Sequence, residues 1–348
     1  MAQILILDGG LGTTLELNHD VQFTPSQPLW SSHLLLSDPS TLLSCQRSFA
    51  LVPVDILLTA TYQMSVEGLA HTKTPDFPNG IRGTDSILPV LEAAVDLAHQ
   101  AVRDTGFPEP KLALSLGPYG ACMVPSTEYT GRYDTQHDDL ASLTDWHAER
   151  MQLFAQLRDP KARVGFVAIE TVPRGDEIAA ARTALGSVPE LAGIPFWISC
   201  LYPEELALPD GTSPENVVRA TLDPRKGGPV PWGIGINCTK VDKLDALVRR
   251  FEGEVARMQG EGLVSAWPAL VLYPDGTNGE VYNTQTKAWE APPPSGPRHA
   301  RIPWEKQLAA VVQAAVSRGK WPAIVAGGCC MSRPADIARL RGLLLPTP

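Results

Sequence analysis

The chain has 348 residues, of which 44% are hydrophobic and 19% are charged, and its net charge is −9. This composition is typical of a folded globular protein and excludes an intrinsically disordered one. The excess of acidic residues argues against a nucleic-acid-binding protein. Because no window of about 18 residues is uninterruptedly apolar, we expect no membrane span.

The cysteines and the first residues of the chain bear on its compartment. Six cysteines are too few for a disulfide scaffold in a chain of this length. The opening segment MAQILILDGG has no basic region, and Asp8 interrupts its apolar run, so we predict no signal peptide. A soluble cytoplasmic protein with reduced cysteines is the simplest interpretation.

Short apolar runs rich in valine, isoleucine and leucine alternate with segments of helical apolar spacing. Each run is nearly continuous in apolar residues, as strands buried on both faces require. The predicted strands are Ile4–Leu7, Asp55–Thr59, Leu112–Leu116, Val164–Ile169, Pro195–Ser199, Trp232–Ile236, Ala269–Tyr273 and Ala323–Ala326. The predicted helices are Ser40–Val52, Asp85–Thr105, Asp138–Arg158, Arg174–Leu185, Pro214–Leu222, Lys240–Met258, Trp304–Arg318 and Arg333–Leu344.

This strict alternation predicts an α/β fold in which crossovers join parallel strands. Eight such units match a closed (β/α)8 barrel, the TIM barrel, which needs about 250 residues. An open doubly wound sheet is the rival fold. The segment Gly9-Gly10-Leu11-Gly12 is too short for the GxGxxG fingerprint that usually follows the first strand of such a sheet. We therefore favour the barrel.

The length of the chain, at roughly 150 residues per domain, suggests about two domains. The barrel instead predicts a single domain over residues 1–348, with the surplus residues in loop insertions. The excess of proline belongs in the same loops, because proline is disfavoured inside helices and strands. The candidate loops are Phe23–Leu29, Thr72–Gly83, Asp223–Pro231 and Ala291–Pro303.

Polar and reactive side chains follow the predicted strands, where a barrel builds its active site. They include four of the six cysteines and two carboxylates: Cys200, Cys238, Cys329, Cys330, Asp8 and Glu170. Three cysteine thiolates suit Zn²⁺ and leave one coordination position open. The alternative is that these cysteines are small buried apolar residues, which is common for free cysteine.

The sequence context of each group favours one interpretation over the other. A Gly-Gly pair at a strand end precedes Cys329 and Cys330, which favours a metal site. Asp8 either caps a turn or binds a ligand. Glu170 follows an apolar run, where an accidental carboxylate is costly. The seven histidines show no ligand spacing, and we expect most of them at the surface.

Four motifs carry a resemblance to a known family. They are Asp8-Gly9-Gly10-Leu11-Gly12-Thr13, Glu170-Thr171, Gly235-Ile236-Asn237-Cys238-Thr239 and Gly327-Gly328-Cys329-Cys330. In this order, and across almost the whole chain, they resemble the motifs of the homocysteine S-methyltransferase family. The stretch from Tyr273-Pro274-Asp275-Gly276 to Gly279-Glu280-Val281-Tyr282 is also similar to a loop of that family.

The resemblance implies a zinc enzyme with Cys238, Cys329 and Cys330 as metal ligands and catalytic residues. Homocysteine would supply the fourth ligand through its sulfur, and Asp8 and Glu170 would hold its amino group. Asn237, within the third motif, is expected to bind substrate as well. One departure is Met331-Ser332-Arg333, where relatives more often have small or threonine-rich residues.

The implied chemistry favours a cationic methyl donor. A thiol coordinated to zinc loses its proton at neutral pH, and four thiolates leave the cluster net negative. Among the family's donors, a sulfonium ranks first, with S-methylmethionine above S-adenosylmethionine. Betaine is an alternative, although betaine-using relatives usually have tyrosine at the position of Thr171. The π-faces of Trp30, Tyr62 and Tyr119 are candidate contacts for the cation.

Two other classes of function remain open. A Schiff-base aldolase needs a reactive lysine, and no lysine stands directly at a predicted strand end. A non-catalytic zinc-binding or zinc-sensing protein needs four protein ligands, and Cys200 is the candidate for the fourth. Beyond small-molecule substrates no partner is predicted, and the oligomeric state is not predicted either.

Overall fold

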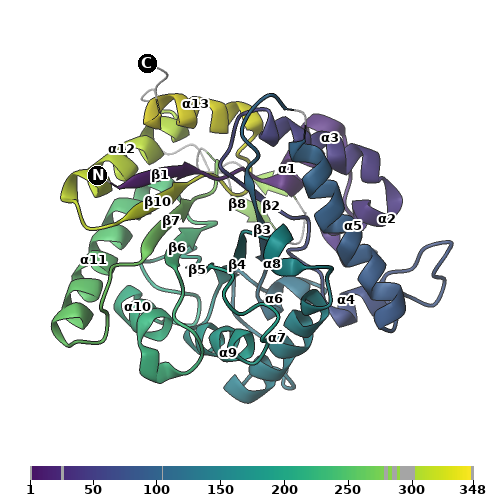
Figure 1. Ribbon diagram of the computed structural model, residues 1–348, viewed down its shortest axis with the longest axis horizontal. Coiled ribbons are helices and arrows are strands. Elements are labelled where there is room, and N and C mark those ends of the chain that lie inside the picture. Colours follow the sequence, from purple (N-terminus) through teal and green to yellow (C-terminus); the bar gives the residue numbers. More distant parts are fainter. Residues whose placement is uncertain are drawn as a thin grey trace.

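The computed structural model describes residues 2–24, 27–103, 105–277, 281–283, 288–290 and 302–345. Eight parallel strands form a ring that helices surround (Figure 1). These strands are β1 (Gln3–Ile6), β2 (Ile56–Leu58), β3 (Lys111–Leu116), β4 (Phe166–Val172), β5 (Phe196–Cys200), β6 (Gly233–Asn237), β7 (Ala269–Tyr273) and β10 (Ala323–Ala326). The predicted (β/α)8 barrel is confirmed.

Each predicted helix is present, with ends within four residues of the prediction. The eight are α3 (Pro39–Ala50), α5 (Thr84–Val102), α7 (Leu140–Ala155), α9 (Gly175–Gly186), α10 (Pro214–Leu222), α11 (Leu244–Gly260), α12 (Trp304–Arg318) and α13 (Pro334–Leu344). The structure adds the short helices α1 (Leu11–His19), α2 (Leu34–Ser37), α4 (Val66–His71), α6 (Tyr119–Cys122) and α8 (Pro160–Arg163), and the 3₁₀ turns η1 (Trp30–His33), η2 (Pro224–Lys226) and η3 (Val241–Lys243).

The ring closes between β1 and β2. Leu7 and Ile56 form a parallel bridge there, and the amide of Asp55 donates to the carbonyl of Ile6 at 2.7 Å. Beyond this bridge the carboxylate of Asp8 accepts a hydrogen bond from the amide of Leu58 at 3.0 Å. A side chain thus replaces the next backbone carbonyl of the ladder, so Asp8 has a structural role at the seam of the barrel.

The inside of the barrel is filled by alternate residues of the strands, as the period of two along a strand requires. A buried cluster contains Leu7, Ile56, Ala113, Phe166, Ala168, Trp197, Val271, Tyr273 and Val325. Continuing the same alternation toward the carboxyl ends, the next inward positions are Ser115, Glu170, Ser199 and Asn237. An apolar floor therefore lies beneath a polar layer at the carboxyl ends of the strands.

Prolines occur at helix ends as well as in loops, which corrects the expectation that loops alone hold them. Pro39, Pro160, Pro214 and Pro334 occupy the first position of a helix, where no backbone N–H is needed. Pro89 lies inside α5, six residues into the helix, so its ring costs one hydrogen bond near the helix start.

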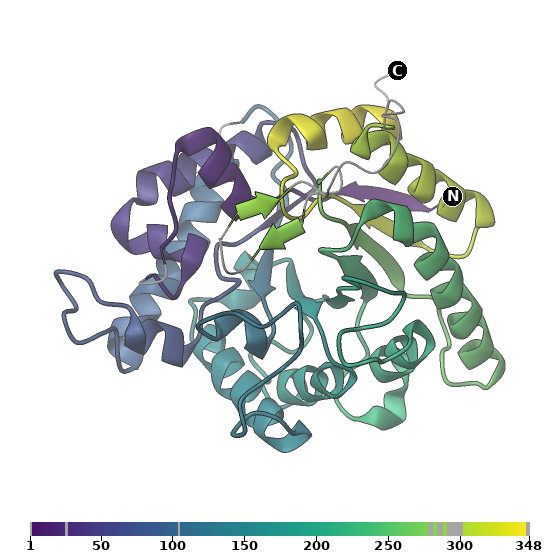
Figure 2. The same ribbon diagram turned by 180° about the vertical axis from the view of Figure 1, so that it is seen from behind.

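Between β7 and α12 the chain contains an antiparallel hairpin of β8 (Val281–Asn283) and β9 (Ala288–Glu290). Figure 2 shows this hairpin in front of the barrel when the molecule is viewed from behind. The predicted loop Ala291–Pro303 lies outside the described residues except for its last two, as do Gly279 and Glu280. No helix in the described part of the chain has the length and apolar character needed to cross a bilayer.

Candidate active site and metal centre

A cavity of about 450 Å³ opens where the carboxyl ends of the strands meet. Its wall is formed by residues that follow β1, β2, β3, β6 and β10, together with side chains of β3, β4 and β7. Representative lining residues are Gly10, Tyr62, Glu128, Glu170, Cys238 and Cys329. The site therefore lies at the end of the barrel where the sequence predicted it.

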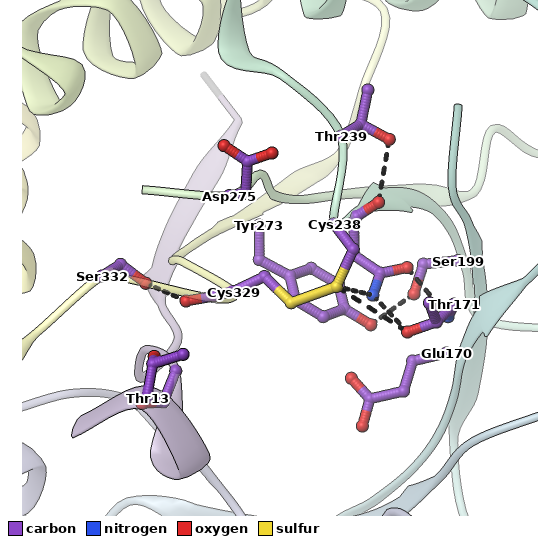
Figure 3. The surroundings of a disulfide bond; sticks show 12 residues. Thr13, Glu170, Thr171, Ser199, Cys238, Thr239, Tyr273, Asp275, Cys329 and Ser332 are labelled. Carbon is purple, nitrogen blue, oxygen red and sulfur yellow. Dashed lines mark hydrogen bonds between the residues drawn. A yellow bond between two sulfur atoms is a disulfide. The ribbon is translucent and has the colours of Figure 1, made fainter. Parts of the chain in front are cut away.

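Three cysteine sulfurs meet at this cavity. The Sγ atoms of Cys238, Cys329 and Cys330 all lie within 4.8 Å of one another. Cys238 and Cys329 are joined as a disulfide (Figure 3). Their Cα atoms lie 5.5 Å apart, and Cys330 is free. This pairing differs from the expected three thiolates. The cause is proximity, because strand ends that gather thiols for a metal also bring two of them within disulfide reach.

The turn that carries the adjacent cysteines packs against the segment after β1. A Cβ atom on Gly10 would lie 2.4 Å from the carbonyl oxygen of Cys329, so only glycine fits there. The hydroxyl of Thr13 accepts a hydrogen bond from the amide of Met331 at 2.8 Å. The Gly-rich motif near the N-terminus thus holds the cysteine turn, more than three hundred residues away in sequence, in place.

Asn237 and Thr171 stand beside the sulfur of Cys238. The side-chain amide of Asn237 donates to that sulfur at 3.4 Å and to the hydroxyl of Thr171 at 2.7 Å. Its carbonyl oxygen accepts from the amide of Thr171 at 2.9 Å. Asn237 is fully buried and is not among the residues that line the cavity. Its hydrogen-bonding groups face Cys238 and Thr171 rather than the space for a substrate.

Cys238 and Thr171 both have left-handed backbone, with φ of +46° and +63°. Such conformations are uncommon for residues other than glycine and cost about 1–3 kcal/mol. The strain is concentrated at the ends of β4 and β6, where the two side chains approach each other. Strain of this kind is typical of a functional site.

Asp8 and Glu170 are buried carboxylates that form no ion pair among the described residues, although the charge of the buried Arg150 lowers the pKa of Glu170 in part. Burial is the main cause that raises the pKa of Glu170 to about 7 and the pKa of Asp8 well above its usual range. The negative charge of Glu170 raises the pKa of Asp8 further. Glu170 lines the cavity and accepts from the hydroxyl of Ser115, whereas Asp8 lies beside the lining residues Gly9 and Leu58.

One oxygen of Asp8 has no partner. Its Oδ2 accepts from Leu58, but Oδ1 is buried with no hydrogen bond in the described structure. An uncompensated carboxylate in such a place is costly unless a cation joins it. The pair is therefore suited to bind a positively charged group at this end of the cavity.

Of the three aromatic residues singled out in the sequence, two line the cavity. Trp30 and Tyr62 are at its wall. Tyr119 instead packs in a separate buried cluster, where it stacks on His137 at 4.3 Å between ring centroids. Two lining residues that sequence analysis missed are Glu128 and Tyr129. They lie in a long segment between α6 and α7, where no periodicity marks a side chain as inward-facing.

The positions of Cys200, of the lysines and of His147 bear on the remaining expectations from the sequence. Cys200 is buried in the large core cluster and does not join the three-cysteine group, so a fourth thiolate is absent from the described part of this site. No lysine lines the described wall of the cavity, which argues against an aldolase. His147 is buried rather than at the surface, with Nε2 3.0 Å from Glu177.

Comparisons with known proteins agree with this geometry. Residues 5–344 match the model of the family described as homocysteine S-methyltransferase. Homocysteine S-methyltransferase YbgG of Bacillus subtilis is 26% identical, covering 97% of this chain and 93% of the relative. Homocysteine S-methyltransferase of Escherichia coli is 27% identical, covering 97% and 94%.

A solved structure supports the fold. The metallated form of the homocysteine methyltransferase MmuM from Escherichia coli superposes with a TM-score of 0.67 at 24% identity. The alignment covers 98% of this chain and 96% of that one. Because the family model spans nearly the whole sequence, the chain belongs to the homocysteine S-methyltransferase family.

Proposed function

We propose that this enzyme transfers a methyl group from a sulfonium donor to the thiol of L-homocysteine, giving methionine. The observation that carries the proposal is one cavity lined by three cysteine sulfurs and by Glu170, with the carboxylate of Asp8 buried beside it. The sulfurs provide a metal site for a thiol substrate, and the carboxylates provide a site for its ammonium group. Reduced cysteines are required for the metal site, in keeping with the proposed cytoplasmic location.

The metal is proposed to be Zn²⁺, held by Cys238, Cys329 and Cys330. Three clustered thiols with a cavity beside them fit a zinc site that keeps one position for substrate. Bound zinc would lower the pKa of the homocysteine thiol so that the sulfur is a thiolate at neutral pH. Asn237 donates to the sulfur of Cys238, and such a hydrogen bond orients a ligand and tunes the charge on it.

Homocysteine is proposed to bind with its ammonium group against Glu170 and Asp8. A cation there supplies the partner that the buried Oδ1 of Asp8 lacks. The carboxylate of homocysteine is proposed to bind at the start of α1. That helix follows Gly10 without a side-chain cap or an acidic residue in its first turn, and its first residues line the cavity. Free amides at a helix N-terminus favour an anion.

In the proposed reaction the homocysteine thiolate attacks the methyl carbon of the donor in line. The new carbon–sulfur bond forms as the bond from that carbon to the sulfonium sulfur breaks, and the electron pair leaves with the donor as a neutral thioether. S-methylmethionine is ranked above S-adenosylmethionine as the donor. The protein positions the two reactants and attracts the cation, which is a large part of what such a transfer needs.

Two alternatives are weaker. A zinc-sensing protein needs a closed site, but the fourth thiolate it requires does not join the described cluster. A betaine-dependent methyltransferase also takes a cationic donor. Thr171 stands where betaine-using relatives usually have tyrosine, and its hydroxyl is engaged with Asn237. The sulfonium donor therefore remains the preferred proposal.

The decisive test uses reduced, zinc-loaded protein. X-ray absorption at the zinc edge should show three protein sulfur ligands, rising to four when homocysteine is added. Labelled methyl transfer should then occur from S-methylmethionine and be slower from betaine. Two results would refute the proposal: a zinc site that already holds four sulfurs before homocysteine is added, or a protein that transfers methyl from neither S-methylmethionine nor S-adenosylmethionine.

A further inference from the structure

The cavity contains a second acidic position, separate from the Asp8 and Glu170 pair. Glu128 lies in the segment that follows α6, and it lines the cavity. The residue as a whole is partly accessible, but its Oε2 atom is buried and has no hydrogen-bond partner in the described structure. The side chain therefore brings an unpaired carboxylate oxygen to the cavity wall.

The segment that carries Glu128 is held in place by its own backbone. The amide of Thr127 donates to the carbonyl of Gly120 at 2.8 Å, and the amide of Gly131 donates to the carbonyl of Thr127 at 2.9 Å. A Cβ atom on Gly120 would lie 3.0 Å from the amide nitrogen of Glu128. Because the loop is packed this closely, the backbone of Glu128 has a fixed place at the cavity wall, from which the side chain brings its buried Oε2 atom to the cavity.

The surroundings of Glu128 provide no positive charge. Among the described residues that line the cavity there is no lysine, arginine or histidine, whereas Glu16, Glu128 and Glu170 all line it. Burial, and not a neighbouring charge, raises the pKa of Glu128 to about 7. In the Asp8 and Glu170 pair, by contrast, the charge of Glu170 adds to the effect of burial and raises the pKa of Asp8 further. Asp8, in that pair, and Glu128 each have a buried carboxylate oxygen without a partner, whereas Glu16 does not, so a cation would stabilise two distinct places.

Glu128 is also close to the sulfur cluster through its neighbour in sequence. Tyr129 lies beside the sulfur of Cys330, and both residues line the cavity together with Glu128. Tyr62 also lines the cavity, and the charge of Glu128 contributes, after burial, to raising the pKa of the Tyr62 phenol. A carboxylate that lines the same cavity as two phenol rings and the sulfurs is suited to one end of a short cationic substrate whose other end must reach the thiolate.

We propose that Glu128 binds the α-ammonium group of the methyl donor and so selects an amino-acid sulfonium over a donor that lacks this group. The inference rests on the proposed function, because it assumes a second amino-acid substrate beside homocysteine. One ammonium group would bind at Glu170 and Asp8, and the other at Glu128. The sulfonium centre then lies between Glu128 and the cysteine sulfurs, where Trp30, Tyr62 and Tyr129 offer π-faces.

Glu128→Gln tests this proposal, because it removes the charge and keeps the shape. The zinc-loaded enzyme is titrated calorimetrically with S-methylmethionine, with homocysteine, and with dimethylsulfoniopropionate, a sulfonium that has no ammonium group. The Kd for S-methylmethionine should rise at least about tenfold, as expected for loss of a charged hydrogen bond. The Kd for homocysteine, the Kd for dimethylsulfoniopropionate and the zinc content should stay within about twofold.

Glu16→Gln is the matched control, because it removes another partly buried carboxylate from the same wall. It should leave the Kd for S-methylmethionine within about twofold. An unchanged Kd in Glu128→Gln, an equal loss for homocysteine, or an equal effect of Glu16→Gln would overturn the assignment. Failure of the proposed function looks different: wild-type enzyme would then transfer no methyl group from any sulfonium to homocysteine.

Discussion

At the scale of single residues, the site is built by the alternation of side chains along strands. Phe166 and Ala168 pack in the interior of the barrel, so Glu170, two residues further along β4, points to the same side. The same two-residue alternation that places Phe166 and Ala168 in the apolar floor therefore places the Glu170 carboxylate in the cavity. Glu170 was singled out in the sequence because it directly follows the apolar run of this strand. Glu128 was not, because a loop has no period from which the direction of a side chain can be read.

The cysteine ligands are tested by changing them one at a time. We expect Cys238→Ser, Cys329→Ser or Cys330→Ser to abolish methyl transfer and to reduce zinc from about one ion per chain to a small fraction, because two thiolates hold the metal much less tightly than three. Metal analysis and a methyl-transfer assay on reduced protein are the measurements. Cys200→Ala is the matched control, since Cys200 also ends a strand but lies in the core. A ligand variant that keeps near-normal zinc and turnover would show that the assignment is wrong.

The carboxylate pair makes a different prediction. Glu170→Gln should raise the KM for homocysteine at least about tenfold, because the ammonium group loses its charged partner, and should change the KM for the sulfonium donor little. Asp8→Asn should act in the same direction without lowering stability, since the amide oxygen of asparagine can still accept from Leu58 at the seam of the barrel and the uncompensated buried charge is removed. Steady-state kinetics with each substrate varied in turn measures both effects. Equal changes in the two KM values would contradict separate ammonium sites.

At the scale of elements, the strands and the long helices were predictable and the short segments at the mouth of the cavity were not. Strands of a parallel barrel are buried on both faces, so each is a continuous apolar run that stands out in sequence. The helix α1 was missed because it begins after Gly10 with no capping side chain. The helix α6 was missed because its four residues are too few for a period. These unpredicted segments adjoin the catalytic face, where function rather than regularity sets the sequence.

A buried network anchors the segment that bears Glu128. Glu177, in the first turn of α9, accepts from the amide of Tyr119 at 2.7 Å and from the hydroxyl of Tyr133 at 2.5 Å, and it contacts His147 at 3.0 Å. Tyr119 and Tyr133 flank the segment 123–129 in sequence. One carboxylate on α9 therefore fixes both ends of the loop that forms part of the cavity wall.

Removing this anchor should loosen the loop and weaken the fold. Glu177→Ala leaves several buried donors without a partner at about 1–3 kcal/mol each, so we expect the free energy of unfolding to fall by about 3 kcal/mol or more. The KM for the sulfonium donor should rise more than the KM for homocysteine. Denaturant titration and steady-state kinetics measure the two effects. Glu149→Ala on the exposed face of α7 is the control, and a similar loss of stability there would argue against a specific anchor.

At the scale of the whole molecule, the metal site joins parts of the chain that the barrel brings together. Cys238 follows β6 and Cys329 follows β10, and β7 lies between these strands in the sheet. The two residues are 91 positions apart in sequence. Eight of the strands form one barrel, as the alternation of strands and helices predicted. Tertiary structure, rather than local sequence, therefore makes the ligand set.

A ligand set made by the fold should stabilise the fold when metal binds. The unfolded chain keeps Cys329 and Cys330 adjacent but separates Cys238 from them, so zinc binds the folded state more tightly. At a free zinc concentration about 100 times the Kd, the folded state should gain about 2.7 kcal/mol, and the Tm of reduced protein should rise accordingly in calorimetry. Under oxidising conditions the shift should vanish, because the disulfide between Cys238 and Cys329 removes two ligands. Cys238→Ser should abolish the shift and Cys200→Ala should retain it. An equal shift in both variants would mean that zinc stabilises the protein from another site.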